Sequence, residues 1–439
     1  MNNPAVSIPA SQRLRSSSLM SDNGIKGEKS SSEKTEDPKT NGSRPSNFSK
    51  NNQGWRRVVR NFSPAWFVTT MGTGIVAVIL HSIPWQARWL YWLSIIVFAL
   101  NALLFLLATG VSVLRYTIWP EIWTVMIEDP NNSLFLGTVP MGFATLINMW
   151  VQICVPAWGV WAAYFAFATW ILDCIVAVMV TVSLGVLLMS SSYQRSLDSI
   201  TAAQLLPIAA TIVAAGVGSE IASVMPEPQL ALGVILASYT LWGMATPMAF
   251  VVLTIYYQRL AIHKMPPREV IVSVFLPLGP LGFGGFGILN LGKQAAIVFP
   301  QTDTLDPMAG RIAYVLGFFV AFIMWGWGLL WFSFAIAALW KTAREEGVPF
   351  NMGFWGFTFP LGVYASSTIL IGQELPSLFF RVLGTIFGVA VILLWVLIAA
   401  RTAKGAYSGA MFKAPCLDNL KEEPAKVPQD GAETETART

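Results

Sequence analysis

Apolar residues form ten long runs along this chain, and short polar segments separate them. A helix that crosses a bilayer needs about 20 mostly apolar residues, and each run meets that length. Two runs, 158–188 and 312–340, exceed it, so we expect these helices to tilt or to extend beyond the bilayer. The pattern predicts an all-α polytopic membrane protein with ten transmembrane helices. The predicted spans are 63–82, 88–110, 134–154, 158–188, 202–223, 230–257, 269–290, 312–340, 352–372 and 377–400.

The two ends of the chain have a different composition from its middle. Residues 1–54 are rich in Ser, Lys, Glu and Asn and hold almost no aromatic residues. A segment of this kind cannot bury enough apolar surface to fold. We therefore predict a disordered N-terminal tail over 1–54, a ten-helix transmembrane domain over 55–404 and a C-terminal tail over 405–439.

Positive residues in the loops predict the orientation. Because the number of predicted spans is even, both tails lie on one side of the membrane. The loops on that side carry seven Lys or Arg residues, and the loops on the opposite side carry four. Since positive loops favour the cytoplasm, we expect both termini to be cytoplasmic.

Every second span carries a similar short pattern, in which Pro precedes Leu, Met or Ile and then Gly or Ala. The first copy has Thr in place of Pro. Each interval between copies holds two spans, so the repeat unit is one helical hairpin, and a repeat at near-constant spacing is strong support for an architecture. We expect five hairpins around a central pore, related by an axis along the membrane normal. The copies are Thr70-Met71-Gly72, Pro140-Met141-Gly142, Pro207-Ile208-Ala209, Pro277-Leu278-Gly279 and Pro360-Leu361-Gly362.

Proline inside a membrane span has a physical consequence. It removes a backbone N–H and clashes with the preceding turn, and lipid offers no group that repairs the loss. We therefore expect the odd-numbered helices to be kinked and to form the inner wall, where freed helix ends solvate an ion without a full charge. The alternative is that the small residues only let helices pack closely. The predicted pore-lining or kink residues are Thr70, Gly72, Pro140, Gly142, Pro207, Pro277, Gly279, Pro360 and Gly362.

Phe359 distinguishes the last copy, because it directly precedes Pro360. The residues that precede the pattern elsewhere are smaller or aliphatic: Thr69, Val139, Leu206 and Leu276. Hydrophobic constrictions can gate a pore by excluding water, so Phe359 is a candidate pore gate. The alternative is ordinary core packing.

A few charged residues lie in or next to predicted spans. Asp173 lies in the middle of the fourth span, and Glu220 lies near the end of the fifth. Intramembrane carboxylates are costly and usually face a cavity or a partner, so we expect a structural or a proton-linked role. Lys293 and Arg381 are predicted on the external side, where they form a positive vestibule or extend to the membrane interface.

Composition excludes several classes of function. Only 12% of residues are charged, against about 25% in a soluble domain, and no basic patch interleaved with aromatics predicts nucleic-acid binding. Two His and three Cys residues support neither a metal site nor histidine-based catalysis, so we expect no cofactor and no enzyme activity. The run Gly282 to Gly287 fits GxGxxG but follows no strand, which the dinucleotide-binding motif requires. The sequence also lacks the P-loop pattern GxxxxGK[ST].

Six stretches are distinctive when taken together with the repeat. They are Phe62-Ser63-Pro64, Met71 to Gly74, Leu136 to Gly142, Leu278 to Gly282, Gly353 to Gly362 and Phe380 to Thr385. On these motifs, residues 55–412 resemble the fungal sulfite efflux pumps of the tellurite-resistance/dicarboxylate transporter family. The resemblance implies ten helices in five hairpins around a central pore, a homotrimer in which each protomer has its own pore, and an aromatic pore plug at Phe359.

The expected function is export of sulfite or bisulfite, or another small anion, across the plasma membrane. Selectivity would come from pore width and uncharged donors, for which the candidates are Thr69, Thr70, Thr73 and Ser366. One alternative is a proton-coupled dicarboxylate permease of the malate type, with Asp173 or Glu220 as the proton site. A sensor or structural membrane protein without transport is another.

Overall fold

The computed structural model describes residues 54–129, 132–190, 197–409, 411, 412, 414 and 417, all within one compact unit that spans 48–439. These residues include ten helices long and apolar enough to cross a membrane, as predicted. The predicted disordered tail over 1–54 lies outside the described residues except for Gly54. Most of the predicted tail over 405–439 also lies outside them, but the last helix continues to Tyr407.

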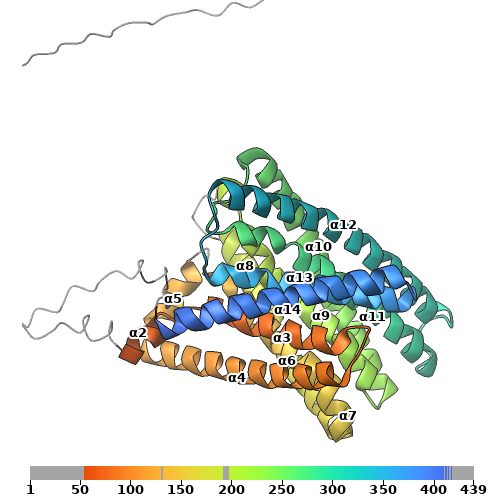
Figure 1. Ribbon diagram of the computed structural model, residues 1–439. Helices are drawn as coiled ribbons and strands as arrows, with labels where there is room; N and C mark the ends of the chain where they lie inside the picture. Colours follow the sequence, from red (N-terminus) through yellow and green to blue (C-terminus); the bar gives the residue numbers. More distant parts are fainter. Residues whose placement is uncertain are drawn as a thin grey trace, which may run out of the picture. The chain divides into compact units, whose positions relative to one another are not determined.

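The ten spans, drawn as ribbons in Figure 1, alternate between a buried and an exposed kind. In the odd-numbered spans 67–94% of residues are buried, and in the even-numbered spans 17–33% are. The buried, inner helices are α3 (Val68–Ser82), α6 (Thr138–Met149), α9 (Leu205–Val224), α11 (Leu278–Val298) and α13 (Thr358–Glu374). The outer helices are α4 (Arg88–Ile118), α8 (Val160–Ser190), α10 (Pro228–His263), α12 (Ala309–Glu345) and α14 (Leu378–Tyr407). Shorter helices are α2 (Gly54–Arg60), α5 (Glu121–Glu128) and α7 (Val155–Trp158).

The inner helices close into a ring. Each packs against the next one along the chain, and α13 packs back against α3. Each outer helix packs against the inner helix of its own hairpin and also contacts the following inner helix. The predicted arrangement of five hairpins is therefore confirmed.

Each outer helix packs against this ring through one narrow stripe of buried residues. In α14 the buried stripe includes Gly384, Gly388 and Val391, at the spacing of one helix face. Large apolar side chains cover the rest, as at Leu397, which is 63% exposed. All five outer helices span 30 to 37 residues, so more than the two long runs predicted from the sequence exceed the minimum for a crossing.

The repeated prolines lie at helix starts, and the predicted kinks at these positions are wrong. Pro140, Pro207 and Pro360 are each the third residue of an inner helix, as is Thr70 in α3. The N–H groups of the first turn have no acceptor within a helix, so proline costs little there. A 3₁₀ turn precedes each inner helix. The proline therefore lies near the junction between this turn and the α-helix, and not in the middle of a helix.

The fourth copy of the repeat has a different register from the predicted one. Pro277 caps α11, and Pro280 is the third residue of that helix. The residue after Pro280 donates its N–H to the Pro277 carbonyl oxygen (3.5 Å), as the residue after Pro360 donates to that of Phe357 (3.4 Å). The structural equivalent is therefore Pro280-Leu281-Gly282, and Gly279 occupies the position that Phe359 has in α13.

Candidate functional site: a closed pore and its vestibule

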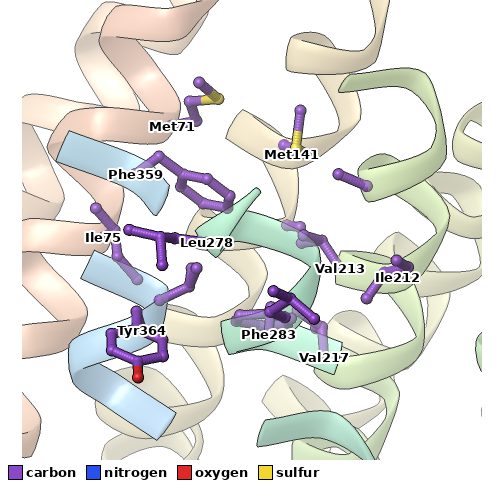
Figure 2. Close-up of a cluster of buried hydrophobic side chains, with 14 of the residues drawn as sticks. Met71, Ile75, Met141, Ile212, Val213, Val217, Leu278, Phe283, Phe359 and Tyr364 are labelled. Atoms are coloured by element: carbon purple, nitrogen blue, oxygen red, sulfur yellow. The ribbon is translucent and has the colours of Figure 1, made fainter. Parts of the chain in front are cut away.

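The five inner helices surround a constriction on the axis of the ring. Its cavity is only about 10 Å³, close to the ~10–15 Å³ that one water molecule needs. An anion cannot pass a space of this size, so the pore is closed here. Figure 2 shows part of the surrounding cluster of buried side chains. The cavity is lined by Ile75, Val78, Ala144, Thr145, Asn148, Val213, Val217, Phe283 and Phe359.

Two phenylalanine rings are the largest side chains in the constriction. Phe359 comes from the first turn of α13 and is 3% exposed, and Phe283 comes from α11 and is 6% exposed. Phe283 also stacks on Phe286, with 5.3 Å between ring centroids. Phe359 thus lies where the gate hypothesis requires it, and Phe283 is a second aromatic that the sequence interpretation missed.

Glycines on neighbouring helices make room for the Phe283 ring. A Cβ atom on Gly216 of α9 would collide with that ring, and a Cβ on Gly287 would come within 3.0 Å of the Gly216 Cα. Because both positions lack side chains, α9 and α11 approach closely. The glycine run that resembles GxGxxG therefore serves helix packing and leaves Phe283 as a bulky residue among small ones.

The predicted pore-lining glycines lie between inner helices. A Cβ on Gly72 would collide with Thr358 of α13, and a Cβ on Gly142 would collide with Thr70 of α3. A Cβ on Gly362 would lie 2.6 Å from the Ile75 side chain. These glycines therefore let neighbouring inner helices pack closely, which was the alternative to the pore-lining prediction. None of them lines the constriction cavity.

The remaining members of that predicted set also lie away from the constriction lining. Thr70 is fully buried and donates its hydroxyl hydrogen bond to the Phe67 carbonyl oxygen (2.7 Å). Gly279 is buried, and a Cβ there would meet nothing within 4 Å. The constriction cavity is not lined by Pro140, Pro207, Pro277 or Pro360.

A wider vestibule opens at the C-terminal ends of the inner helices. Its cavity is about 450 Å³ and takes residues from α3, α9, α11 and α13. Gln152 reaches it from a π-helical turn, Trp150–Cys154, that follows α6. The polar residues that line it are His81, Ser82, Gln86, Gln152, Glu220, Asn290, Lys293, Ser366 and Gln373.

Hydrogen bonds hold the charged groups of the vestibule. The Lys293 ammonium lies 2.7 Å from a Glu374 carboxylate oxygen, and the Tyr314 hydroxyl donates to the other oxygen of that carboxylate (2.6 Å). The Asn290 amide donates to Glu220 (3.3 Å). Lys293 is the one Lys or Arg among the described residues that line this cavity, so it contributes a positive charge that Glu374 partly offsets.

The other predicted residues divide between the vestibule and other places. Ser366 lines the vestibule, whereas Thr69 and Thr73 line a separate pocket beside α4 and α14. Arg381 is exposed on α14 and does not line the vestibule cavity. The uncharged donors named from the sequence therefore do not form one continuous wall.

Asp173 is buried at the interface between α8 and α9. On α8 it lies on the same buried face as Trp170 and Ala177. The Trp170 indole N–H donates to the Ala214 carbonyl oxygen of α9 (2.9 Å). Asp173 is 1% exposed, and neither carboxylate oxygen has a hydrogen-bond partner among the described residues. It lines neither the constriction nor the vestibule, which places it off the pore.

No group of three or more His, Cys, Asp or Glu side chains that could hold a metal ion occurs in the described part of the chain. Cys154 and Cys174 are free thiols, and Cys416 lies outside the described residues. The arrangement offers a closed, mostly apolar constriction and a polar vestibule that holds the charged groups Lys293 and Glu220.

The comparison with protein families gives one match over most of the chain. Residues 61–403 match the family model described as voltage-dependent anion channel. This range covers all ten spans except the last few residues of α14.

Curated relatives have names that refer to anion transport. The chain is 46% identical to the sulfite efflux pump of Arthroderma benhamiae over 81% of this chain and 93% of the relative. It is also 46% identical to the sulfite efflux pump of Trichophyton rubrum, with the same coverage. The malic acid transport protein of Schizosaccharomyces pombe is more distant, at 24% identity over 77% of each chain.

Proposed function

Because this chain belongs to the voltage-dependent anion channel family, we propose that it is a multi-pass membrane transporter that exports sulfite or bisulfite through its central pore. The observation that carries the proposal is the path itself. A polar vestibule of about 450 Å³ leads to an apolar constriction of about 10 Å³. The constriction is built by the five inner helices, and the vestibule by four of them together with the π-helical turn that follows α6. A pore of this form passes a small ion when its constriction opens.

The choice of sulfite rests on the relatives. The sulfite efflux pumps are 46% identical to this chain over 81% of its length. The constriction suits a small anion because none of the described residues that line it is acidic. An apolar and weakly polar wall lets an anion enter without trapping it.

The membrane potential supplies a driving force in the export direction. A cytosol-negative potential favours anion exit by about 2.3 kcal/mol per charge per 100 mV. A gated passive path therefore suffices, and the sequence contains no P-loop. In this scheme Phe359 and Phe283 form the gate, and Lys293 attracts the anion to the vestibule.

Several finer features belong to the same proposal. We place the protein in the plasma membrane with both termini in the cytoplasm, which the excess of positive residues in the loops on that side supports. We also propose a homotrimer in which each protomer has its own pore, and no catalytic activity.

A proton-coupled malate permease is the second candidate. The support for it is the malic acid transport protein among the relatives and the carboxylate of Glu220 in the vestibule. In that case Glu220 would carry the coupled proton.

Flux into liposomes separates the two candidates. The purified full-length protein is reconstituted, and uptake of sulfite and of malate is measured under an imposed potential, with and without a pH gradient. We expect sulfite flux that follows the potential and needs no pH gradient. Malate flux that requires a pH gradient, with no sulfite flux, would overturn the proposal.

Cells provide the second half of the test. A sulfite-sensitive cell that lacks its own sulfite exporter should regain growth on sulfite when it produces this protein. Regained growth on sulfite together with unchanged malate uptake supports export of sulfite. Unchanged sensitivity with correctly inserted protein contradicts it.

A further inference from the structure

A second, larger cavity lies away from the pore, between the ends of α10 and α12 and the loop that follows α10. Its volume is about 870 Å³, and it is lined by residues of both outer helices. Four cationic and two acidic residues lie among its lining: Arg259, Lys264, Arg268 and Lys341, and Glu345 and Glu346. The transport path uses none of these residues.

Arg259 is a buried charge without a carboxylate partner. The residue is 7% exposed. Its guanidinium donates to the Asp198 carbonyl oxygen from Nε and Nη2 (3.3 Å each) and to the Lys264 carbonyl oxygen from Nη1 (2.6 Å). No described carboxylate lies within ion-pair distance of it. Buried charges are normally paired, so Arg259 indicates an anion that completes this site.

Two lysines add positive charge at the mouth of the cavity. Lys264 and Lys341 are both exposed and form no ion pair with any described residue. Arg268 is already engaged, because it pairs with Glu269 (3.0 Å) and donates to the Glu346 carbonyl oxygen (3.1 Å). The cations of the cavity that form no ion pair with a described carboxylate are therefore Arg259, Lys264 and Lys341.

The inner part of the cavity is apolar and aromatic. Tyr257 of α10 and Phe334 of α12 both pack against Trp331, with centroid distances of 6.5 and 6.0 Å. Tyr257 and Phe334 are 54% and 40% exposed on the outer surface of the helices. The Trp331 indole N–H is buried and has no acceptor among the described residues. A cationic mouth thus continues into an apolar, lipid-facing groove.

We infer that this cavity binds a membrane phospholipid with an anionic headgroup. Its phosphate lies against Arg259, Lys264 and Lys341, and its acyl chains follow the apolar outer faces of α10 and α12. A soluble anion would use the cations but leave the aromatic groove empty, and an uncharged lipid would leave Arg259 without a counter-charge. The cytoplasmic leaflet is rich in anionic lipid, and the proposed orientation places this end of α10 and α12 on that side.

Binding of a fluorescent phosphatidylserine tests the inference on the purified full-length protein in detergent micelles. Phosphatidylcholine with the same label is the reference lipid. We expect phosphatidylserine to bind more tightly. The double variant Lys264→Gln/Lys341→Gln should weaken this binding by about 25-fold. Each positive charge removed near a lipid surface should weaken it by about fivefold, and the double variant removes two.

Arg344→Gln is the matched control. Arg344 lies on the same last turns of α12 and is exposed, but its guanidinium stacks over the Trp340 ring (4.1 Å) and does not line the cavity. This variant should bind phosphatidylserine as the unchanged protein does. Both lysines are exposed, so the double variant should fold, and its thermal unfolding without lipid should match that of the control.

Three results would overturn the inference. One is equal affinity for the two labelled lipids. Another is an equal loss of affinity in Arg344→Gln and in the double lysine variant. The third is displacement of phosphatidylserine by inorganic phosphate alone, which would make the site one for a soluble anion.

Discussion

The constriction and the vestibule are made by the same five inner spans, a few turns apart, and they differ in nearly every physical property. The constriction holds about 10 Å³ between mostly apolar side chains, and the vestibule holds about 450 Å³ with nine polar residues in its lining. Apart from the π-helical turn that follows α6 at the vestibule, the ring of inner helices continues through both regions. Side-chain size and the direction in which each helix presents its side chains therefore distinguish the two regions.

The comparison shows how a pore can be closed without a moving domain. Phe359 and Phe283 fill the constriction, while small residues around them bring the helices together. In the vestibule the same helices carry Ser366, Asn290 and Glu220 in the corresponding direction. A change of side-chain rotamer at the two rings would widen the constriction toward the vestibule without any domain motion. Rotamer changes are far faster than domain motions.

The largest expected effect comes from removing the rings. Phe359→Ala should raise anion conductance at least about tenfold, because a barrier lowered by ~1.4 kcal/mol already gives that factor. Phe283→Ala should act in the same direction, and the double variant should conduct most. Conductance is measured on the reconstituted protein under a fixed potential.

The control for this prediction is Phe379→Ala, which removes the same ring from a site on α14 that is 64% exposed. It should leave conductance unchanged. Because a deleted core phenylalanine costs ~3–5 kcal/mol of stability, thermal unfolding of each variant must show that it remains folded. Unchanged or lower conductance in folded Phe359→Ala protein contradicts the gate.

A smaller effect is expected from the glycine that accommodates Phe283. Gly216→Ala should lower the free energy of unfolding by ~1–3 kcal/mol, the usual cost of overpacking a core, because its Cβ would collide with the Phe283 ring. In the Phe283→Ala background the same substitution should cost little. Chemical denaturation of the four proteins measures this coupling, and equal costs in both backgrounds would show that Gly216 and Phe283 act independently.

The vestibule should respond to charge more weakly. Lys293→Gln should lower sulfite flux by about twofold, in line with the ~0.5 kcal/mol typical of an exposed charge pair. Glu374→Gln should raise the flux, because it frees the Lys293 charge that it now offsets at 2.7 Å. Both effects should fade at high ionic strength. Flux changes of the same sign in the two variants would exclude electrostatic attraction by Lys293.

The smallest effect is expected off the pore. Asp173→Asn should leave sulfite flux and its pH dependence unchanged, because Asp173 lines neither cavity and lies on the buried face of α8. Flux measured over a range of pH values checks this. A pH dependence that disappears in the variant would assign proton coupling to Asp173 and favour the dicarboxylate permease.

The sequence predicted the spans and the hairpin repeat because both depend on local properties. A run of about 20 apolar residues is a helix in a membrane wherever it lies, and a proline in the first turn marks the helix start in four of the five copies. The fourth copy was misregistered, because Pro277 and Pro280 both fit the pattern and only the hydrogen bonds of α11 distinguish them.

The lining of the pore was harder to predict. Gly142 and Gly279 are both small residues of the repeat, yet a Cβ would collide with Thr70 at the first and would meet nothing within 4 Å at the second. Phe359 was identified by its position in the motif, whereas Phe283 is one phenylalanine among 27. No sequence pattern states which face of α11 turns toward the axis.

The sequence by itself thus determined the helices, their pairing into hairpins and the polar or apolar character of each stretch. Tertiary structure alone decided which residues meet on the axis. A helix has 3.6 residues per turn, so a small rotation exchanges a residue that faces the pore for one that faces its neighbour. That rotation is set by the packing of all five hairpins around the ring, to which residues from every part of the transmembrane domain contribute.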